Sequence, residues 1–395
     1  MSRPIAEIFA AFTKLGFTSF GGPVAHMSFF RAEFVEKRKW LSENAYADLV
    51  ALCQFLPGPS SSQVGFALGL QRGGLLGGLA AFVAFTLPSA VFLVLFALFA
   101  DKLTGWFGTG LIHGLKLVAT AVVAQAILGM SISLCNTKIT ATIAVLALLI
   151  VTLISGPLGQ VSAILFGAIV GRFGIKAAQS ETNRDHSPPL IPALSANTAF
   201  VIFVFLLFGL PLLAQNTQNL RLDLIDSFYR AGALVFGGGH VVLPLLETEI
   251  VTTGIVNKDS FLAGYGMTQA VPGPIFSFAA FLGAASAPFP SAITNAITAT
   301  VAIFSPGFLL VYAIMPHWQK FRMLPSAKTL LAGANAAVVG LLGAAFFSPI
   351  WQSTVLKPLD FALVATAFVM LTKWKVPPWL MVILGAIVGA VLGAI

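Results

Sequence analysis

The sequence predicts an all-α polytopic membrane protein built from two inverted-topology repeats. The chain has 395 residues, of which 57% are hydrophobic and 9% are charged, whereas a soluble domain carries about 25% charged residues. One phrase, F-x-[KR]-x-G-x-x-x-F-G-G, occurs at 12–22 and again at 228–238. A second phrase, Gln-x-x-Pro-Gly-Pro, follows each copy, at 54–59 and 269–274. Helix breakers repeated inside apolar sequence predict two homologous halves.

The first repeat is expected to span residues 1–175. It opens with two helix–break–helix hairpins, Ile5–Val35 and Ala45–Leu70, which we expect to enter the membrane and return on the same side. The alternative is that each is a broken full span, which would change the number of crossings. About four spanning helices should follow in each repeat. The apolar stretches of spanning or near-spanning length are Leu75–Ala100, Gly110–Met130, Ile139–Ile154, Val161–Gly171, Ala199–Ala214, Ala292–Met315, Leu330–Phe347, Leu359–Leu371 and Pro377–Ile395.

A polar stretch, 176–196, is expected to be a cytoplasmic linker, and 197–215 a single linking transmembrane helix. The second repeat, 216–395, would then be inverted. Charge supports the inversion, because cytoplasmic loops collect Lys and Arg. The loop at 31–39 is basic, whereas its counterpart holds Glu247, Glu249, Lys258 and Asp259. The expected location is the cell inner membrane, as a multi-pass protein.

The four breaks are expected to form a binding site. Proline stops a helix, and the freed backbone groups must line a polar cavity or be buried in protein. Each new half-helix then points free N–H groups into that cavity, which suits an anion. The first repeat adds Ser60, Ser61, Ser62 and Gln63, whereas the second has 275–277, Ile-Phe-Ser, so the site should be asymmetric. The alternative is that the breaks are only packing kinks.

Two matched cations, Lys14 and Arg230, lie in the first half-helix of each repeat. An intramembrane cation is a functional candidate, although Lys14 could instead reach the interface. With the half-helix ends, the cations would favour a doubly charged oxyanion. The full set of predicted substrate-binding residues is Lys14, Gly21, Gly22, His26, Gln54, Pro57, Gly58, Ser60, Ser61, Ser62, Gln63, Arg230, Gly237, Gly238, His240, Gln269, Gly273 and Ser277.

Proton coupling is predicted at Glu33, Asp48 or Glu249. Glu33 could equally pair with Arg31 or Lys37 in a solvated loop. His26 and His240 follow the Gly-Gly breaks at different offsets, so they are not strict repeat partners. Each could bind substrate or titrate, or simply be a packed histidine.

Several classes of function are disfavoured. The sequence has no GxxxxGK[ST] phosphate loop, so ATP is not expected to drive this chain. No nucleophile–base spacing indicates an enzyme, the two cysteines and five histidines are scattered, and neither a metal nor a cofactor is expected. The net charge of +8 is expected from cytoplasmic loops rather than from a nucleic-acid partner. The lipid bilayer is an expected partner, and a homodimer stays open.

At these residues the chain resembles the chromate ion transporter (CHR) family in its long, two-domain form. The stretch from Lys14 to Ser89 and the two stretches 228–250 and 269–274 are similar to its two repeats. One departure is that the second repeat has Ile255-Val256 where the first has Trp40-Leu41. The motif positions carried over are Lys14, Gly21, Gly22, Pro23, His26, Trp40, Gln54, Pro57, Gly58, Pro59, Gln63, Arg230, Gly237, Gly238, Gly239, His240, Gln269, Pro272, Gly273 and Pro274.

The resemblance implies a secondary transporter that exports chromate, a tetrahedral dianion, and confers chromate resistance. Two alternatives remain on the same scaffold. One is an importer or exchanger for sulfate or another anion, and the other is an anion channel.

Overall fold

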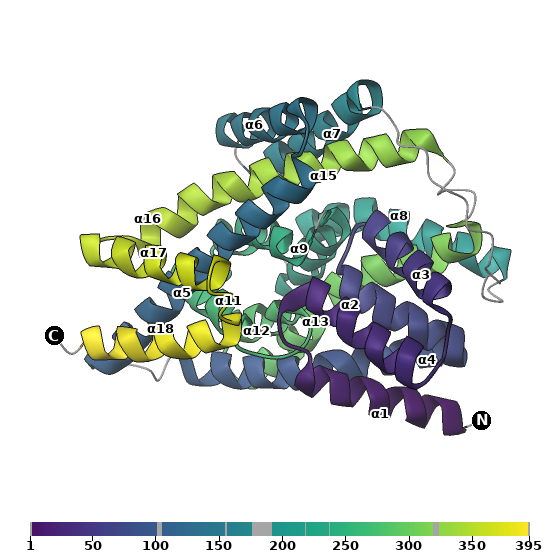
Figure 1. The fold of residues 1–395 in the computed structure, drawn as a ribbon, viewed down its shortest axis with the longest axis horizontal. Coiled ribbons are helices and arrows are strands. Elements are labelled where there is room, and N and C mark those ends of the chain that lie inside the picture. The colour runs from purple at the N-terminus through teal and green to yellow at the C-terminus, as the bar shows by residue number, and fades with distance from the viewer. Residues whose placement is uncertain are drawn as a thin grey trace.

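The computed structural model describes residues 2–100, 105–154, 156–175, 192–217, 219–236, 238–318 and 324–393 (Figure 1). Within these ranges the chain is helical and contains no strand. Of the expected features, Gly237 and residues 176–191 of the linker lie outside the described residues. The helical architecture confirms the all-α prediction for the described part of the chain.

The first half begins with the two expected helix–break–helix units and continues with longer helices. Its elements are α1 (Ser2–Thr18), α2 (Gly22–Phe30), η1 (Arg31–Lys37), α3 (Glu43–Phe55), α4 (Ser60–Ala100), α5 (Gly105–Leu134), α6 (Lys138–Leu153) and α7 (Pro157–Gly174). α4 joins the half-helix after the Pro-Gly-Pro turn to the first long apolar stretch, and its backbone is non-helical at Gly73 and Gly74.

The linking helix and the second half follow the same order. Its elements are α8 (Ala193–Thr217), α9 (Leu220–Leu234), η2 (Gly239–Val241), α10 (Val242–Leu246), η3 (Glu247–Val251), α11 (Lys258–Thr268), η4 (Ile275–Ser277), α12 (Phe278–Ala285), α13 (Ser291–Ile314), η5 (Met315–His317), α15 (Pro325–Ala345), η6 (Phe346–Trp351), α16 (Gln352–Thr354), α17 (Pro358–Thr372) and α18 (Pro378–Leu392). Thus α9 occupies the place of α1, α11 that of α3, and α13 that of the second part of α4.

Local signals that start helices are also matched between the halves. Ser42 caps α3 by accepting a hydrogen bond from the N–H of Ala45. Asn257 caps α11 in the same way through Ser260. Such side chains satisfy N–H groups that have no partner within the helix. The two caps lie at equivalent positions of the sequence repeat, so the duplication extends to the helix boundaries.

Six helices of the described residues are long and apolar enough to cross a membrane: 60–100, 105–134, 157–174, 194–217, 291–317 and 326–354. α6, α17 and α18 are apolar but have only 15 or 16 residues, whereas a full span needs about 20. The multi-pass prediction is therefore confirmed. Four full spans in each half and the re-entrant path of the hairpins stay predictions.

The two halves interlock through their last helices. α6 and α7 of the first half pack on α15 of the second, and α17 and α18 of the second half pack on α5 of the first (Figure 1). Glycines allow both contacts, because a Cβ on Gly333 of α15 would overlap the backbone oxygen of Gly167 in α7, and one on Gly114 of α5 would overlap that of Gly385 in α18. Small residues at such crossings let helix backbones approach closely in a membrane protein.

The first helix of each half packs on the long helix that follows its own breaks. α1 contacts α4, and α9 contacts α13. A Cβ on Gly16 would lie 3.1 Å from Pro88, and one on Gly232 would lie 3.1 Å from Pro306. These four residues are equivalent in pairs, so both halves hold their broken helices by the same contact.

Candidate functional site

The Pro-Gly-Pro turns are built around glycines with positive φ. Gly58 has φ of 121° and Gly273 has φ of 101°. Glycine adopts this conformation without the steric penalty that a Cβ imposes. The first Gly-Gly break is similar, with φ of 98° at Gly21 and 77° at Gly22. The predicted breaks therefore fall on glycines whose backbone conformation departs from the helix.

Two reciprocal hydrogen bonds join the breaks of one half to those of the other. The N–H of Gly58 donates to the backbone oxygen of Val235 at 2.8 Å, and the N–H of Gly273 donates to that of Ser19 at 2.9 Å. Gly58 and Gly273 are equivalent in the sequence repeat, and so are Ser19 and Val235. Each Pro-Gly-Pro turn thus crosses to the Gly-Gly break of the opposite half. We call the region where these four breaks meet the junction.

Side chains next to the junction also form hydrogen bonds between the two halves. The Gln63 amide donates to the backbone oxygens of Pro57, at 2.9 Å, and of Gly307, at 3.2 Å. On the equivalent side, the Ser277 hydroxyl lies 2.6 Å from that of Ser89. Gly307 and Ser89 are matched positions on α13 and α4. Both predicted residues, Gln63 and Ser277, therefore bridge the halves.

Several buried polar atoms next to these bonds have no protein partner. They are the hydroxyls of Ser19 and Ser62, the free oxygen of Gln63 and the amide nitrogen of Gln269. Ser19 is 0% exposed and Ser62 is 3% exposed. Buried polar groups are nearly always hydrogen-bonded, so unpartnered donors beside the N-terminus of α4 fit a ligand that accepts hydrogen bonds. α4 begins at Ser60, which is half-buried.

His26 is fully buried at the junction. Its Nε2 lies 3.2 Å from the backbone oxygen of Ser19, and its Nδ1 lies 3.3 Å from the Ser61 hydroxyl. Because a carbonyl oxygen only accepts, Nε2 carries the hydrogen, and in a neutral ring Nδ1 accepts from Ser61. His240 instead contacts the Tyr265 hydroxyl through Nδ1, at 2.6 Å. The two histidines therefore have different surroundings, in keeping with their different offsets.

The matched cations are held by matched carboxylates. Lys14 lies 3.5 Å from Glu33, and Arg230 lies 2.8 Å from Glu249. Arg230 also pairs with Asp226, at 2.8 Å. Lys14 and Arg230 each precede a break by five residues, about 7.5 Å along a helix. The structure thus places both cations beside acidic partners on the approach to the junction.

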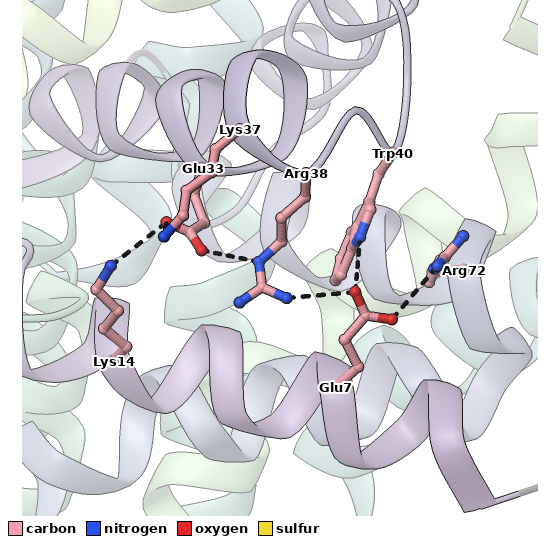
Figure 2. Close-up of polar contacts among 7 residues, drawn as sticks. All are labelled: Glu7, Lys14, Glu33, Lys37, Arg38, Trp40 and Arg72. Carbon is pink, nitrogen blue, oxygen red and sulfur yellow. Dashed lines mark hydrogen bonds and ion pairs between the residues drawn. The ribbon is translucent and has the colours of Figure 1, made fainter.

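Glu33 gathers more cations than the sequence alone predicted. Its Oε1 accepts from Arg38 at 2.8 Å, and Lys14 and Lys37 each lie 3.5 Å from Oε2 (Figure 2). Burial raises the pKa of Glu33, but the Arg38 hydrogen bond and the charges of Lys14 and Lys37 outweigh it and lower the pKa overall. Pairing with Lys37 is therefore present. Arg31 instead pairs with Glu36 and Glu43.

Other predicted residues lie at the edge of the junction or elsewhere. Gln54 is exposed on α3, and Asp48 is half-buried on the same helix. Gly238 has φ of 147° just before η2. Gly22 and Gly239 both lie close to the side chain of Ile275, the second-half counterpart of Ser60. The second-half turn thus presents an apolar residue where the first presents a hydroxyl.

The sequence reasoning missed two polar contacts between the halves. Lys116 of α5 pairs with Asp259 of α11 at 2.6 Å, and His113 of α5 contacts Asp360 of α17 at 2.8 Å. The only signal in the sequence was a lysine inside an apolar run. The equivalent residues of α15 are Thr329 and Ala332, which carry no charge.

Two further features bear on what the protein can bind. An apolar recess of about 660 Å³ between α4, α8 and α13 is lined by no charged residue, so it does not suit an anion. Across the described ranges, no group of three or more His, Cys, Asp or Glu side chains could hold a metal ion. Among the described residues, the junction combines unpartnered buried donors with a helix N-terminus.

Opposed helix breaks within a bundle of long apolar helices define a multi-pass membrane protein with a central polar junction. Comparison with known proteins then identifies the family. A family profile described as "Chromate transporter" matches residues 6–172 and again 222–390. The chain belongs to the chromate transporter family. The two separate matches coincide with the two halves of the fold.

Named relatives resemble the chain over most of its length. A probable chromate transport protein of Synechococcus elongatus is 29% identical, over 96% of this chain and 93% of the relative. A chromate transport protein of Pseudomonas aeruginosa is 27% identical, over 87% and 80%. One of Cupriavidus metallidurans is also 27% identical, over 98% and 93%. No solved structure matches the chain.

Proposed function

We propose that this protein is a secondary active transporter that exports chromate across the cell inner membrane and so confers chromate resistance. The observation that carries the proposal is the pair of reciprocal hydrogen bonds, Gly58 to Val235 and Gly273 to Ser19, which join four helix breaks at one junction. Interrupted helices that meet between two homologous halves are the arrangement in which transporters bind small ions. Family membership makes chromate the expected ion.

The first half would hold the anion. The N-terminus of α4 offers free N–H groups with a partial positive charge, and the unpartnered hydroxyls of Ser62 and Ser19 offer two further donors. Ser60 and Ser61 extend this set. In the neutral state of His26 the Ser61 proton is directed to Nδ1, whereas a protonated His26 would donate and release the Ser61 hydroxyl toward the anion. The substrate and a proton could then bind together.

The second half would supply the opposing wall. Gly273, Gln269 and Ser277 lie on its break, and the Gln269 amide nitrogen is buried without a partner. Ser277 is engaged by Ser89 and by the backbone oxygen of Pro274. The second half therefore offers fewer free donors than the first. Arg230 is paired with two carboxylates, so we assign it to orienting α9 rather than to gripping the anion.

The inverted orientation of the halves supports alternating access. With the basic loop at 31–39 in the cytoplasm, the two halves would open to opposite sides of the membrane. Export of a dianion from a negative-inside cell is favoured by about 2.3 kcal/mol per charge for each 100 mV. The potential alone can therefore drive export, and proton binding would adjust the net charge moved. A homodimer stays a prediction.

Transport into inside-out vesicles tests this function. Purified protein in such vesicles should accumulate radiolabelled chromate in a saturable way, and an imposed inside-positive potential should increase the rate. Labelled sulfate and an imposed pH gradient form the other arms. Equal saturable uptake of both anions would replace chromate export with general oxyanion transport, and a linear flux with unitary currents would replace a transporter with a channel.

A pair of variants tests the site. Ser62→Ala removes one donor to a charged ligand, a contact worth about 1.5–3 kcal/mol, so the Michaelis constant for chromate should rise about tenfold or more. Ser131→Ala, near the far end of α5, is the control and should transport as the wild type does. If Ser62→Ala and Ser131→Ala have the same Michaelis constant for chromate, the anion does not bind at the N-terminus of α4.

A further inference from the structure

A ladder of charged side chains runs along α1 from its N-terminal end toward the junction (Figure 2). The cations Arg72 and Arg38 pair with Glu7, at 3.3 and 3.2 Å. Arg38 also reaches Glu33, which is shared with Lys14 and Lys37. Trp40 donates to Glu7 at 3.2 Å, and its ring lies under the guanidinium groups of Arg38 and Arg72. We call the six charged residues the α1 ladder.

The α1 ladder holds four cations against two carboxylates. Within it, the two carboxylate oxygens of Glu33 are bound very differently. Arg38 holds Oε1 at 2.8 Å, a normal charge-assisted hydrogen bond, whereas Lys14 and Lys37 share Oε2 from 3.5 Å each. Their side chains are 57% and 63% exposed. Two accessible ammonium groups thus share one carboxylate oxygen, and within the described residues neither has a second acidic partner.

The second half carries the same scaffold with the opposite charge. Arg230, the counterpart of Lys14, is held at 2.8 Å by both Asp226 and Glu249 and is 25% exposed. Lys37 is replaced by a threonine, since both 252 and 253 are Thr. The Arg72 position is Ala287. Asp223 stands at the position of Glu7. Within the described residues this counterpart therefore has one cation against three carboxylates, and the cation is paired with two of them.

We propose that Lys14 and Lys37 form a docking station for a tetrahedral oxyanion at the first-half mouth of the transport path. The proposal rests on the proposed function. The two lysines would be a first binding site for the exported anion, about 7.5 Å before the junction. Positive charge at a mouth raises the local concentration of anions and their association rate. The negative counterpart on the second half would disfavour rebinding on the other side. The two equivalent positions of the duplicated fold would thus carry opposite net charge, positive where the anion enters and negative where it leaves.

Lys37→Gln tests the station without touching the junction. Arg38 and Lys14 still hold Glu33 in this variant, so the fold should be kept. Arg31→Gln is the matched control, because Arg31 lies in the same element but pairs outside the ladder, with Glu36 and Glu43. In inside-out vesicles at low ionic strength, Lys37→Gln should raise the Michaelis constant for chromate about tenfold with an unchanged turnover number.

Salt and charge rescue sharpen the test. The difference between Lys37→Gln and the control should shrink as the salt concentration rises, because salt screens exposed charges over about 10 Å at 0.1 M. Lys37→Arg keeps the charge and should restore the wild-type constant. If Lys37→Gln and Arg31→Gln have equal Michaelis constants at every salt concentration, the station does not exist. A wild type that carries no chromate would instead refute the proposed function.

A lipid phosphate has the same chemistry as a free oxyanion, and a second arm separates them. Chromate binding is measured in nanodiscs of purely zwitterionic lipid and in nanodiscs that also contain an anionic lipid. If the station collects ions from solution, the Lys37→Gln defect in chromate affinity should appear in both lipid compositions. A defect that disappears when anionic lipid is added would mean that a headgroup occupies the lysines, and would overturn the proposal.

Discussion

Alanine at Gly273 should weaken the junction from its centre. Gly273 has φ of 101°, and a Cβ there would lie 2.9 Å from the Ser89 hydroxyl and 3.3 Å from the backbone oxygen of Phe85. The positive φ costs a residue with a Cβ about 1–2 kcal/mol. Displacing the turn would also lose the hydrogen bond to Ser19, worth about 1 kcal/mol. The expected destabilisation is therefore about 2–3 kcal/mol.

Gly254→Ala separates the backbone penalty from the loss of the junction. Gly254 has φ of 77°, and no atom lies within 4 Å of a Cβ built there. In this control the free energy of unfolding should fall only by the backbone penalty, about 1–2 kcal/mol. Gly58→Ala should reproduce the larger effect, because its Cβ would lie 3.1 Å from the Cα of Gly307 and its N–H makes the reciprocal bond.

Thermal unfolding in detergent is monitored by size-exclusion chromatography. Chromate uptake in vesicles is measured in parallel. Gly273→Ala and Gly58→Ala should lose several degrees of melting temperature relative to Gly254→Ala and should transport poorly. If all three variants unfold at one temperature and transport alike, the crossed hydrogen bonds do not hold the halves together.

Two further predictions concern the interlock and pH. Gly114→Leu should prevent α18 from packing on α5 and abolish the folded monodisperse peak, whereas Gly129→Leu, on the same helix with open space around it, should not; equal peaks would refute the interlock. Glu33 has a lowered pKa, so its stabilising contact with Arg38 is complete above the ordinary carboxyl range and is lost only as pH falls through the lower folded-state pKa. The melting temperature of Glu33→Gln should therefore stay below that of the wild type from pH 8 to 5 and converge with it only in stronger acid. Convergence already near neutral pH would contradict the pairing.

Sequence reasoning located the breaks because glycine and proline act locally. A Pro-Gly-Pro turn in apolar sequence ends a helix whatever surrounds it, so the positions of Gly58 and Gly273 followed directly. The offset between the copies also matched Lys14 with Arg230 and Glu33 with Glu249. Their pairing was not predicted, since equal offsets show equivalence between halves and not contact within one half.

What the sequence did not predict depends on contacts across the halves. The packing of α7 on α15 uses glycines that look like any glycine in an apolar helix. Gln54 was placed in the site because it precedes a turn by three residues, yet it is exposed on α3. Its counterpart Gln269 is half-buried with an unpartnered amide. Equivalent glutamines of the two repeats thus lie in different environments, one exposed and one half-buried. Three-dimensional packing determines this difference, and the sequence repeat does not show it.

The most direct test of the account is to locate chromium in the protein. Crystals grown with chromate and measured at the chromium absorption edge should contain an anomalous peak at the junction, beside the N-terminus of α4 and within hydrogen-bonding distance of Ser62. Chromium found only away from the junction, with that position empty at saturating chromate, would contradict the central claim that the four helix breaks form the anion site.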